Sequence, residues 1–300
     1  MKTSFSRALA VLLAAALLCG AAPLMAGAEG IDITDKFTDP AFRAAVQEII
    51  GKDVILDTDV AGMTELDVSG VFIFDFFGPF GDISSLAGLE HFTALKYLNC
   101  ELNQLTTLPA LPSELDTLEC SFNDLTSLPV LPSTLETLHC YSNKLTALPA
   151  LPSSLEEISC DNNRLTALPA LPSSLGFLSC SSNQLSELPA LPSGLEVLVC
   201  FGNQLTVLPA LPSSLTRLWC NMNQLTSLDL TGLQLKSLIC DHNNMKNISA
   251  LKGYTGSDGT LIFYPQNVPQ DPAPFYSIWP SWAQWFLEYI LFGWLWMAYV

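Results

Sequence analysis

The sequence has few charged residues, and basic residues are the scarcest of them. Only 14% of the 300 residues are charged, with 12 Lys and Arg against 29 Asp and Glu, which gives a formal net charge of −17. A chain this acidic repels phosphate backbones, so the composition argues against nucleic acid as a partner. Because 49% of the residues are hydrophobic, the low charge does not indicate a disordered acidic tail.

Catalytic and metal-binding motifs are also missing. The sequence has no Gly-x-Ser-x-Gly, no His-Glu-x-x-His and no phosphate-binding glycine loop. Cys-x-x-Cys pairs are absent, and the three histidines, His91, His139 and His242, are scattered along the chain. We therefore expect a non-enzymatic protein with no catalytic residue, no cofactor and no metal site.

The N-terminal residues 1–28 have the composition of a secretory signal peptide. Lys2 and Arg7 precede the apolar run Ala8 to Leu18, and Ala26-Gly27-Ala28 offers small residues for cleavage. Leu18 stands where a lipoprotein signal requires a small residue before Cys19, which argues against lipidation. Removal of this segment leaves 10 basic against 29 acidic residues. The signal peptide predicts a secreted or cell-surface protein.

Eight cysteines recur at a fixed spacing of 20 residues, and this spacing predicts a solenoid of stacked coils. They are Cys100, Cys120, Cys140, Cys160, Cys180, Cys200, Cys220 and Cys240. One copy of the surrounding frame reads Leu135-x-x-Leu138-x-Cys140-x-x-Asn143-x-Leu145. This frame resembles the short leucine-rich repeat of bacterial proteins, with cysteine in place of the third leucine, over residues 63–250. The resemblance implies an α/β-type leucine-rich repeat fold: a right-handed curved solenoid of mostly short parallel strands with a helix-poor convex side.

Each position that recurs in the frame from coil to coil has a structural explanation. The leucines and the cysteine alternate along a short strand, so they point inward and stack into a continuous core. An asparagine recurs every 20 residues from Asn103 to Asn243, where its amide offers both a donor and an acceptor to the turning backbone. Leu-Pro-x-Leu-Pro appears six times, starting at residues 108 to 208, and its two prolines exclude an α-helix there.

The oxidation state of the cysteines stays open at the level of sequence. A secreted protein with many cysteines suggests disulfides. In neighbouring parallel strands, however, the Cβ vectors run side by side rather than converging, which favours free, buried thiols. Partial oxidation of adjacent pairs and metal ligation are the alternatives.

Both ends of the array require caps. Asp39-Pro40 predicts a helix start and Gly51 a helix end, so residues 29–62 form a helical cap similar to those that precede the repeats of internalin-like proteins. Degenerate coils are expected at residues 63–68 and 83–86. The phenylalanine-rich segment 71–80 between them is either local core or an exposed partner-binding loop. Residues 251–276 are expected to form a C-terminal cap and linker.

The concave face is the expected ligand-binding surface, because its side chains flank the inward leucine and cysteine of each strand. Its first half is polar and acidic, whereas its second half gathers aromatic and aliphatic residues with one arginine, a composition typical of binding hot spots. The candidate residues are Tyr97, His139, Tyr141, Phe177, Val197, Val199, Phe201, Arg217 and Trp219.

The C-terminal segment 277–300 is rich in tryptophan, with five of the six tryptophans between Trp279 and Trp296. Three interpretations stay open for it. Residues 281–300 form a membrane-seated helix, or dock on a partner or on copies of the chain, or pack as a lid on the last coil.

These observations favour an exported binding module that recognises a protein ligand through its concave face. The alternative is a structural cell-surface protein that self-associates through its aromatic C-terminal segment.

Overall fold

The computed structural model describes residues 30–70, 81–246, 248–254 and 260–263. The predicted signal peptide, the phenylalanine-rich segment 71–80 and the tryptophan-rich segment 277–300 lie outside the described residues. The interpretations given for these three segments therefore remain predictions.

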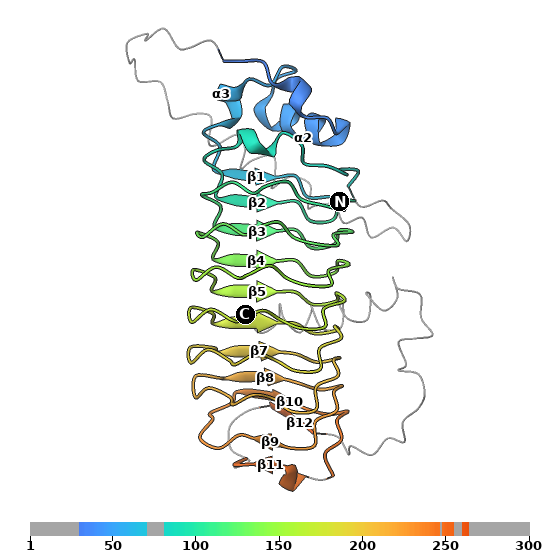
Figure 1. Cartoon of the computed structure of the whole chain (residues 1–300), viewed down its shortest axis with the longest axis vertical. Helices are drawn as coiled ribbons and strands as arrows, with labels where there is room; N and C mark the ends of the chain where they lie inside the picture. The colour runs from blue at the N-terminus through green and yellow to red at the C-terminus, as the bar shows by residue number, and fades with distance from the viewer. Residues whose placement is uncertain (1–29, 71–80, 247, 255–259, 264–300) are drawn as a thin grey trace, which may run out of the picture.

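The chain forms a solenoid built on one parallel sheet of ten short strands, stacked like the rungs of a ladder (Figure 1). The pairing keeps one register throughout, so that Leu98 lies beside Leu118 and Leu118 beside Leu138. The strands, in sheet order, are β1 (Glu65–Asp67), β2 (Tyr97–Asn99), β3 (Thr117–Glu119), β4 (Thr137–His139), β5 (Glu157–Ser159), β6 (Phe177–Ser179), β7 (Val197–Val199), β8 (Arg217–Trp219), β10 (Ser237–Ile239) and β12 (Thr260–Ile262).

The core is a set of columns in which one inward residue of each coil stacks on the same residue of the next. In β4, Leu138 is buried while the two residues beside it are half-buried. Leu135, Cys140 and Leu145 complete this inward set, and all are fully buried. Because each coil covers its neighbours, no coil could bury its apolar face alone.

Asparagine side chains join consecutive coils at the turn that follows each strand. Asn163 Nδ2 donates to the carbonyl oxygens of Cys140 (3.0 Å) and Cys160 (3.1 Å), while Asn163 Oδ1 accepts from the Leu145 N–H (3.0 Å). The amide thus satisfies buried backbone groups of two coils at once, as expected from its donor and acceptor. The ladder runs through Asn103, Asn123, Asn143, Asn163, Asn183, Asn203, Asn223 and Asn243, all of them buried.

The convex side between β2 and β10 is helix-free, as the prolines predict. Hydroxyl groups bind successive coils here: Ser174 Oγ donates to the carbonyl oxygens of Leu155 (2.6 Å) and Ser153 (2.9 Å). Towards the C-terminal end, where the Leu-Pro pattern stops, β9 (Leu228–Asp229) pairs with β11 (Leu251–Lys252), which follows the 3-10 helix η3 (Ile248–Ala250).

Two short helices lie at the N-terminal end of the stack, α2 (Pro40–Ile50) and α3 (Asp57–Val60) (Figure 1). Asp39 Oδ1 accepts from the N–H groups of Ala41 and Phe42, and Gly51 ends α2 in the left-handed region at φ 69°. The other oxygen of Asp39 accepts from the Ser84 hydroxyl at 2.7 Å and from two backbone N–H groups. This carboxylate therefore ties α2 to the first coil.

Aromatic packing supports the same junction. Phe37 lies between Phe42 and Phe92, with ring centroids 5.4 Å and 6.2 Å apart. Phe37 follows the 3-10 helix η1 (Thr34–Lys36), and Phe92 follows the 3-10 helix η2 (Leu89–His91). Phe42 and Val46 form the buried side of α2, whereas Ile49 is 46% exposed.

The degenerate coil expected at residues 83–86 is not a separate coil. β1 pairs directly with β2, and Ile83 and Leu86 are buried in the same coil as β1. The Gln104 N–H donates to the Ile83 carbonyl oxygen, just as the Asp124 N–H donates to that of Leu105. Ile83 therefore takes the place of Leu105 in the first coil, the coil that contains β1.

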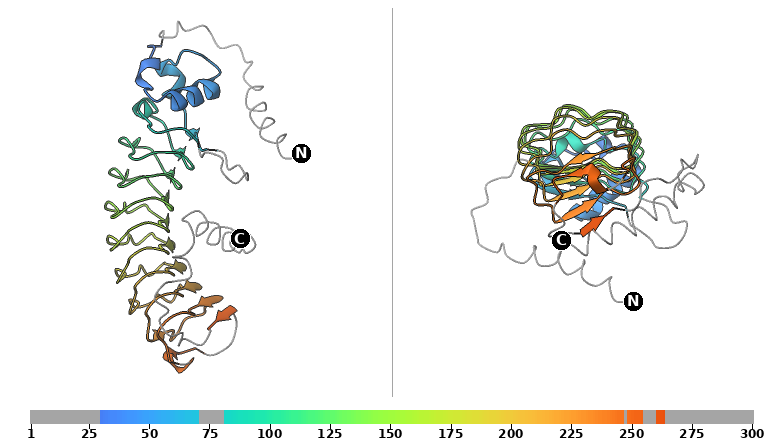
Figure 2. Two further views of the ribbon diagram at one scale, coloured as in Figure 1. Left: turned by 90° about the vertical axis from the view of Figure 1, so that its right-hand side faces the viewer. Right: turned by 90° about the horizontal axis from the view of Figure 1, so that it is seen from below.

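The solenoid is curved, and its strands line the inner side of the curve (Figure 2). The proline-rich segments lie on the outer side. In the part of the chain that the structure describes, no helix has the length and apolarity needed to cross a bilayer.

Candidate ligand-binding face

The inner, concave face consists of three rows of outward side chains that run along the stack. The first row comes from the first residue of each strand, as in Tyr97, and the middle row from the third, as in His139. The third row lies two residues beyond the strand, as in Tyr141. Because the strands pair in one register, residues 20 apart are neighbours in a row. All nine residues predicted from the sequence lie on this face.

The acidic half of the face, over β2 to β5, is defined here as Glu101, Glu119, Glu157 and Asp161 around His139. His139 Nε2 lies 3.0 Å from Glu157 Oε1. Burial alone lowers the pKa of His139, but the hydrogen bond to Glu157 and the charges of Glu157, Glu119 and Glu101 outweigh it and raise the pKa above 6.5. The imidazole is thus held towards its cationic form among carboxylates.

Two tyrosines flank the carboxylates of the acidic half. The Tyr97 hydroxyl donates to Glu119 Oε2 at 2.8 Å, and desolvation together with that carboxylate raises the pKa of Tyr97. Tyr141 lies near His139, with ring centroids 6.4 Å apart, and meets Phe122 edge to face at 5.2 Å. Tyr97, His139 and Tyr141 therefore lie on the acidic half as one group.

Glu101 and Asp161 are more strongly desolvated than Glu119 and Glu157, the other two carboxylates of the acidic half. Desolvation raises the pKa of Glu101, and its Oε1 atom is buried with no hydrogen-bond partner among the described residues. Desolvation also raises the pKa of Asp161, although the Ser179 hydroxyl (2.6 Å) and the Ser181 N–H (2.7 Å) donate to its Oδ1. Partly desolvated carboxylates attract cationic groups more strongly than fully hydrated ones.

The apolar half of the face, over β6 to β8, is defined here as Phe177, Val197, Val199, Phe201 and Trp219, with Arg217 beside Val197 in the first row. Trp219 Nε1 donates to Ser237 Oγ at 3.0 Å, which orients the indole. Val199 is 8% exposed, so it supports this surface rather than offering much area of its own.

The sequence-based set of candidates omits the four carboxylates of the acidic half. Glu101, Glu119, Glu157 and Asp161 occupy outward positions of the same frame and account for the acidic character that the sequence predicts for this half. Their grouping around His139 depends on the strand register, which brings Glu119 and Glu157 to either side of β4.

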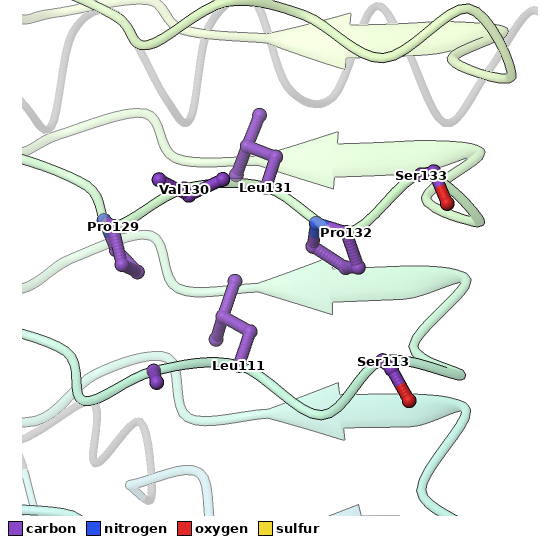
Figure 3. A pocket seen from close by; sticks show the side chains of 8 residues that line it. Leu111, Ser113, Pro129, Val130, Leu131, Pro132 and Ser133 are labelled. Carbon is purple, nitrogen blue, oxygen red and sulfur yellow. The ribbon is translucent and has the colours of Figure 1, made fainter.

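A shallow hollow of about 530 Å³ lies on the convex side, between two consecutive Leu-Pro-x-Leu-Pro segments (Figure 3). It is lined by Ala110, Leu111, Ser113, Pro129, Val130, Leu131, Pro132 and Ser133. None of these side chains is charged, and most belong to the repeated frame, so the hollow has no distinctive chemistry. Within the described residues, no group of three or more His, Cys, Asp or Glu side chains could hold a metal ion.

The eight cysteines of the column, all within the described residues, are thiols rather than disulfides, and all are fully buried. Burial raises the pKa of the Cys160 and Cys200 thiols well above 9.0 and that of Cys240 to about 12. Such thiols are poor nucleophiles and poor metal ligands, so the column is a structural feature rather than a reactive one.

Solved structures of bacterial repeat proteins are similar to this chain. The leucine-rich effector protein YopM from Yersinia pestis is 27% identical, with 80% of this chain and 67% of that chain covered, at a TM-score of 0.62. The functional domain of InlJ from Listeria monocytogenes, which includes a cysteine ladder, is 25% identical, with 79% of this chain and 61% of that chain covered, at a TM-score of 0.53. No family model and no curated protein sequence matches.

Proposed function

Because this chain is a leucine-rich repeat protein, with a solenoid similar to those of YopM and InlJ, we propose that it is an exported, non-enzymatic module that binds a protein ligand through its concave face. Leucine-rich repeat proteins of this kind serve as protein-interaction modules, which is the general basis of the proposal. The finer assignment, to one face and one ligand chemistry, rests on the distribution of side chains over that face.

The observation that carries the proposal is the contrast between inward and outward positions. The inward cysteine and the ladder asparagine are the same in all eight coils, whereas the outward residues differ from coil to coil. Folding requires only the inward set. The outward residues nevertheless separate into an acidic half and an apolar half, a division that the repeat itself does not impose.

The chemistry of the two halves defines the ligand. The carboxylates over β2 to β5 favour lysine or arginine side chains, and partial burial strengthens that preference. The aromatic and aliphatic side chains over β6 to β8 favour an apolar anchor. We infer that the ligand presents a basic patch next to an apolar patch. The centres of the two patches should lie a few strand spacings apart.

Selection of peptides from a random displayed library on the immobilised full chain tests this proposal. We expect the selected peptides to combine Lys or Arg with Trp, Phe or Leu. The double variant Phe201→Glu/Trp219→Glu should weaken their binding at least tenfold. The matched control is Val130→Glu/Val207→Glu, which places the same charges on convex residues that are 86% and 65% exposed.

The control variant should bind the selected peptides as the unmodified chain does. If binding survives the concave substitutions and is lost with the convex ones, the proposed face is wrong. Equal thermal midpoints of the two variants ensure that the comparison concerns binding rather than folding.

A further inference from the structure

The apolar half of the concave face is unusual for the surface of an acidic protein. Phe177, Phe201 and Trp219 are half-buried on a chain with a net charge of −17. Between the first and third rows, Ser179 and Val199 are each 8% exposed, whereas the other middle-row residues from β2 to β10 are half-buried. Contiguous apolar surface of this kind generally marks a contact site, so an occupant is expected.

We propose that the occupant is the tryptophan-rich segment 277–300 of the same chain, which covers the apolar half until a ligand displaces it. This inference deepens the proposed function, because it assigns regulation to the same binding face. It rests on the position at which the described chain ends, on the chemistry of the segment and on the charges of the two surfaces.

The segment is within reach of the apolar half. β12 pairs with β10, β10 with β8 and β8 with β7, so the last strand lies three spacings from β7, or about 14 Å. Residues 264–276 follow the last described residue, Phe263, and thirteen extended residues span up to roughly 40 Å. The connection is therefore long enough to return along the concave face without strain.

The composition of the segment complements the surface. It holds five of the six tryptophans and a single charged residue, Glu288. Among the outward positions of β6 to β8, all of which the structure describes, Arg217 is the only charged one. One carboxylate on the segment and one guanidinium on the face define an orientation in which Glu288 meets Arg217, while the tryptophans cover the phenylalanines.

Intramolecular docking is favoured over association with a second copy. A segment tethered by a short linker has an effective concentration in the millimolar range at its own surface, far above that of a second copy at micromolar protein. A helix of 20 residues would be about 30 Å long, enough to lie across the strands of the apolar half.

Photo-cross-linking of the full chain tests the proposal directly. Benzoylphenylalanine replaces Val197 in the apolar half or, as the matched control, Thr137 in the same row of the acidic half. After irradiation at micromolar concentration without detergent, position 197 should yield a product of monomer mass whose cross-linked peptide comes from residues 277–300. Position 137 should yield at least tenfold less of it.

Several outcomes overturn the inference. A product of twice the monomer mass identifies a second copy as the occupant. A chain that stays in solution only with detergent or lipid assigns the segment to a membrane. A yield at position 197 no higher than at position 137 places the segment elsewhere, including on the last coil.

Charge reversal tests the orientation. Arg217→Glu and Glu288→Arg should each lower the cross-link yield about fivefold, and the double variant should restore it. Unchanged yields in both single variants overturn the proposed orientation. The cross-linking experiment uses no external ligand, so its result does not depend on the proposed function. If the segment is not docked but the chain binds the selected peptides, this inference is overturned and the proposed function stands. A docked segment on a chain that binds no peptide, even after displacement by Glu288→Arg, which leaves the concave face unaltered, overturns the proposed function alone.

Discussion

His139 is the residue whose protonation most directly links the concave face to pH. Its pKa is raised in the folded state, so its ion pair with Glu157 stabilises the protein fully below the unfolded pKa of about 6.5 and loses this effect as the pH rises through the folded pKa. We expect His139→Gln to lower the free energy of unfolding by about 0.5–1 kcal/mol at pH 5.5. The deficit should shrink towards zero by alkaline pH.

Urea denaturation between pH 5.5 and 8.5 measures the effect of His139→Gln. His91→Gln provides the control, because His91 lies outside the acidic half, with its Nε2 atom 3.8 Å from Glu90 Oε1. A stability gap for His139→Gln that widens as the pH rises would contradict the assignment.

Gly194 is a residue at which the repeat departs from its own pattern. Ser174 and Ser214, one coil before and one coil after, donate their hydroxyls to carbonyl oxygens of the preceding coil. A Cβ atom on Gly194 would lie 3.9 Å from the Ser173 carbonyl oxygen, with room to spare. Gly194→Ser should therefore add the missing hydrogen bond.

The expected gain from Gly194→Ser is about 0.5–1.5 kcal/mol of unfolding free energy beyond that of Gly194→Ala. The alanine variant isolates the loss of unfolded-state entropy, which alone contributes about 0.4–1 kcal/mol. Chemical denaturation of both variants measures the difference. If Ser and Ala prove equivalent, the hydroxyl has no partner there.

At the residue scale, the inward positions could be predicted from the sequence because they repeat. The leucines, cysteines and ladder asparagines follow directly from the period. The residue before each ladder asparagine could not be predicted: it is left-handed in every coil, with φ of 50–57° at seven non-glycine residues such as Phe122 and Met222. Gly202, Asn162 and His242 are of types that favour this conformation, but the ladder imposes it on leucine, phenylalanine, serine and methionine as well.

Among the structural elements, the first coil differs most from the repeat. Gly70 and Gly81 stand on either side of segment 71–80 in the sequence. The Gly70 N–H donates to the carbonyl oxygen of Glu101, and the Gly81 N–H donates to that of Leu102. A Cβ on Gly70 would lie 2.0 Å from the Leu102 carbonyl oxygen, and a Cβ on Gly81 would lie 2.3 Å from Asn103 Oδ1. The backbone at Gly70 and Gly81, called the neck here, is therefore packed too closely against Leu102 and Asn103 to leave room for a side chain.

Gly70→Ala and Gly81→Ala should each lower the free energy of unfolding by about 1–3 kcal/mol, because backbone and ladder atoms must move. Gly62→Ala is the matched control, since nothing lies within 4 Å of its added methyl group. Urea denaturation measures all three variants. Equal stability of the neck variants and the control would show that the neck tolerates a side chain.

The sequence predicted the bounds of helix α2 closely but the first coil poorly, for a physical reason. Asp39, Pro40 and Gly51 define α2 through local hydrogen bonding and backbone preference, which a sequence shows directly. The assignment of Ile83 to the first coil depends on its pairing with Gln104 in the next coil. That contact joins residues far apart in the chain, and no local pattern reports it.

For the whole molecule, the chemistry of the concave face was largely readable from the sequence, because row membership follows from the 20-residue period. The extent to which each of these side chains is buried could not be read from the sequence. Val199 and Ser179 are buried although their neighbours in the row are half-buried, and Glu101 lies deeper than its position alone suggests. Such differences depend on the sizes of the side chains in adjacent rows.

The stack as a whole should accept the loss of one complete coil but not of half a coil. Deletion of residues 141–160 joins Cys140 to Asp161 and leaves every inward column, ladder asparagine and strand register in step. In a solenoid the free energy of unfolding is roughly a sum of coil and interface terms, so the shortened chain should fold cooperatively with a lower stability. Its urea m-value should fall roughly in proportion to the residues removed.

Deletion of residues 141–150 is the control, because it removes Asn143 and Leu145 and places Leu151-Pro152 directly after Cys140. Half of one coil then has no partner for its buried backbone groups, and this chain should not give a single cooperative transition. Circular dichroism during urea titration distinguishes the two. If the half-coil deletion unfolds as cooperatively as the full-coil deletion, the inward columns do not set the register of the stack. The conclusion that the chain can lose only whole coils would then be wrong.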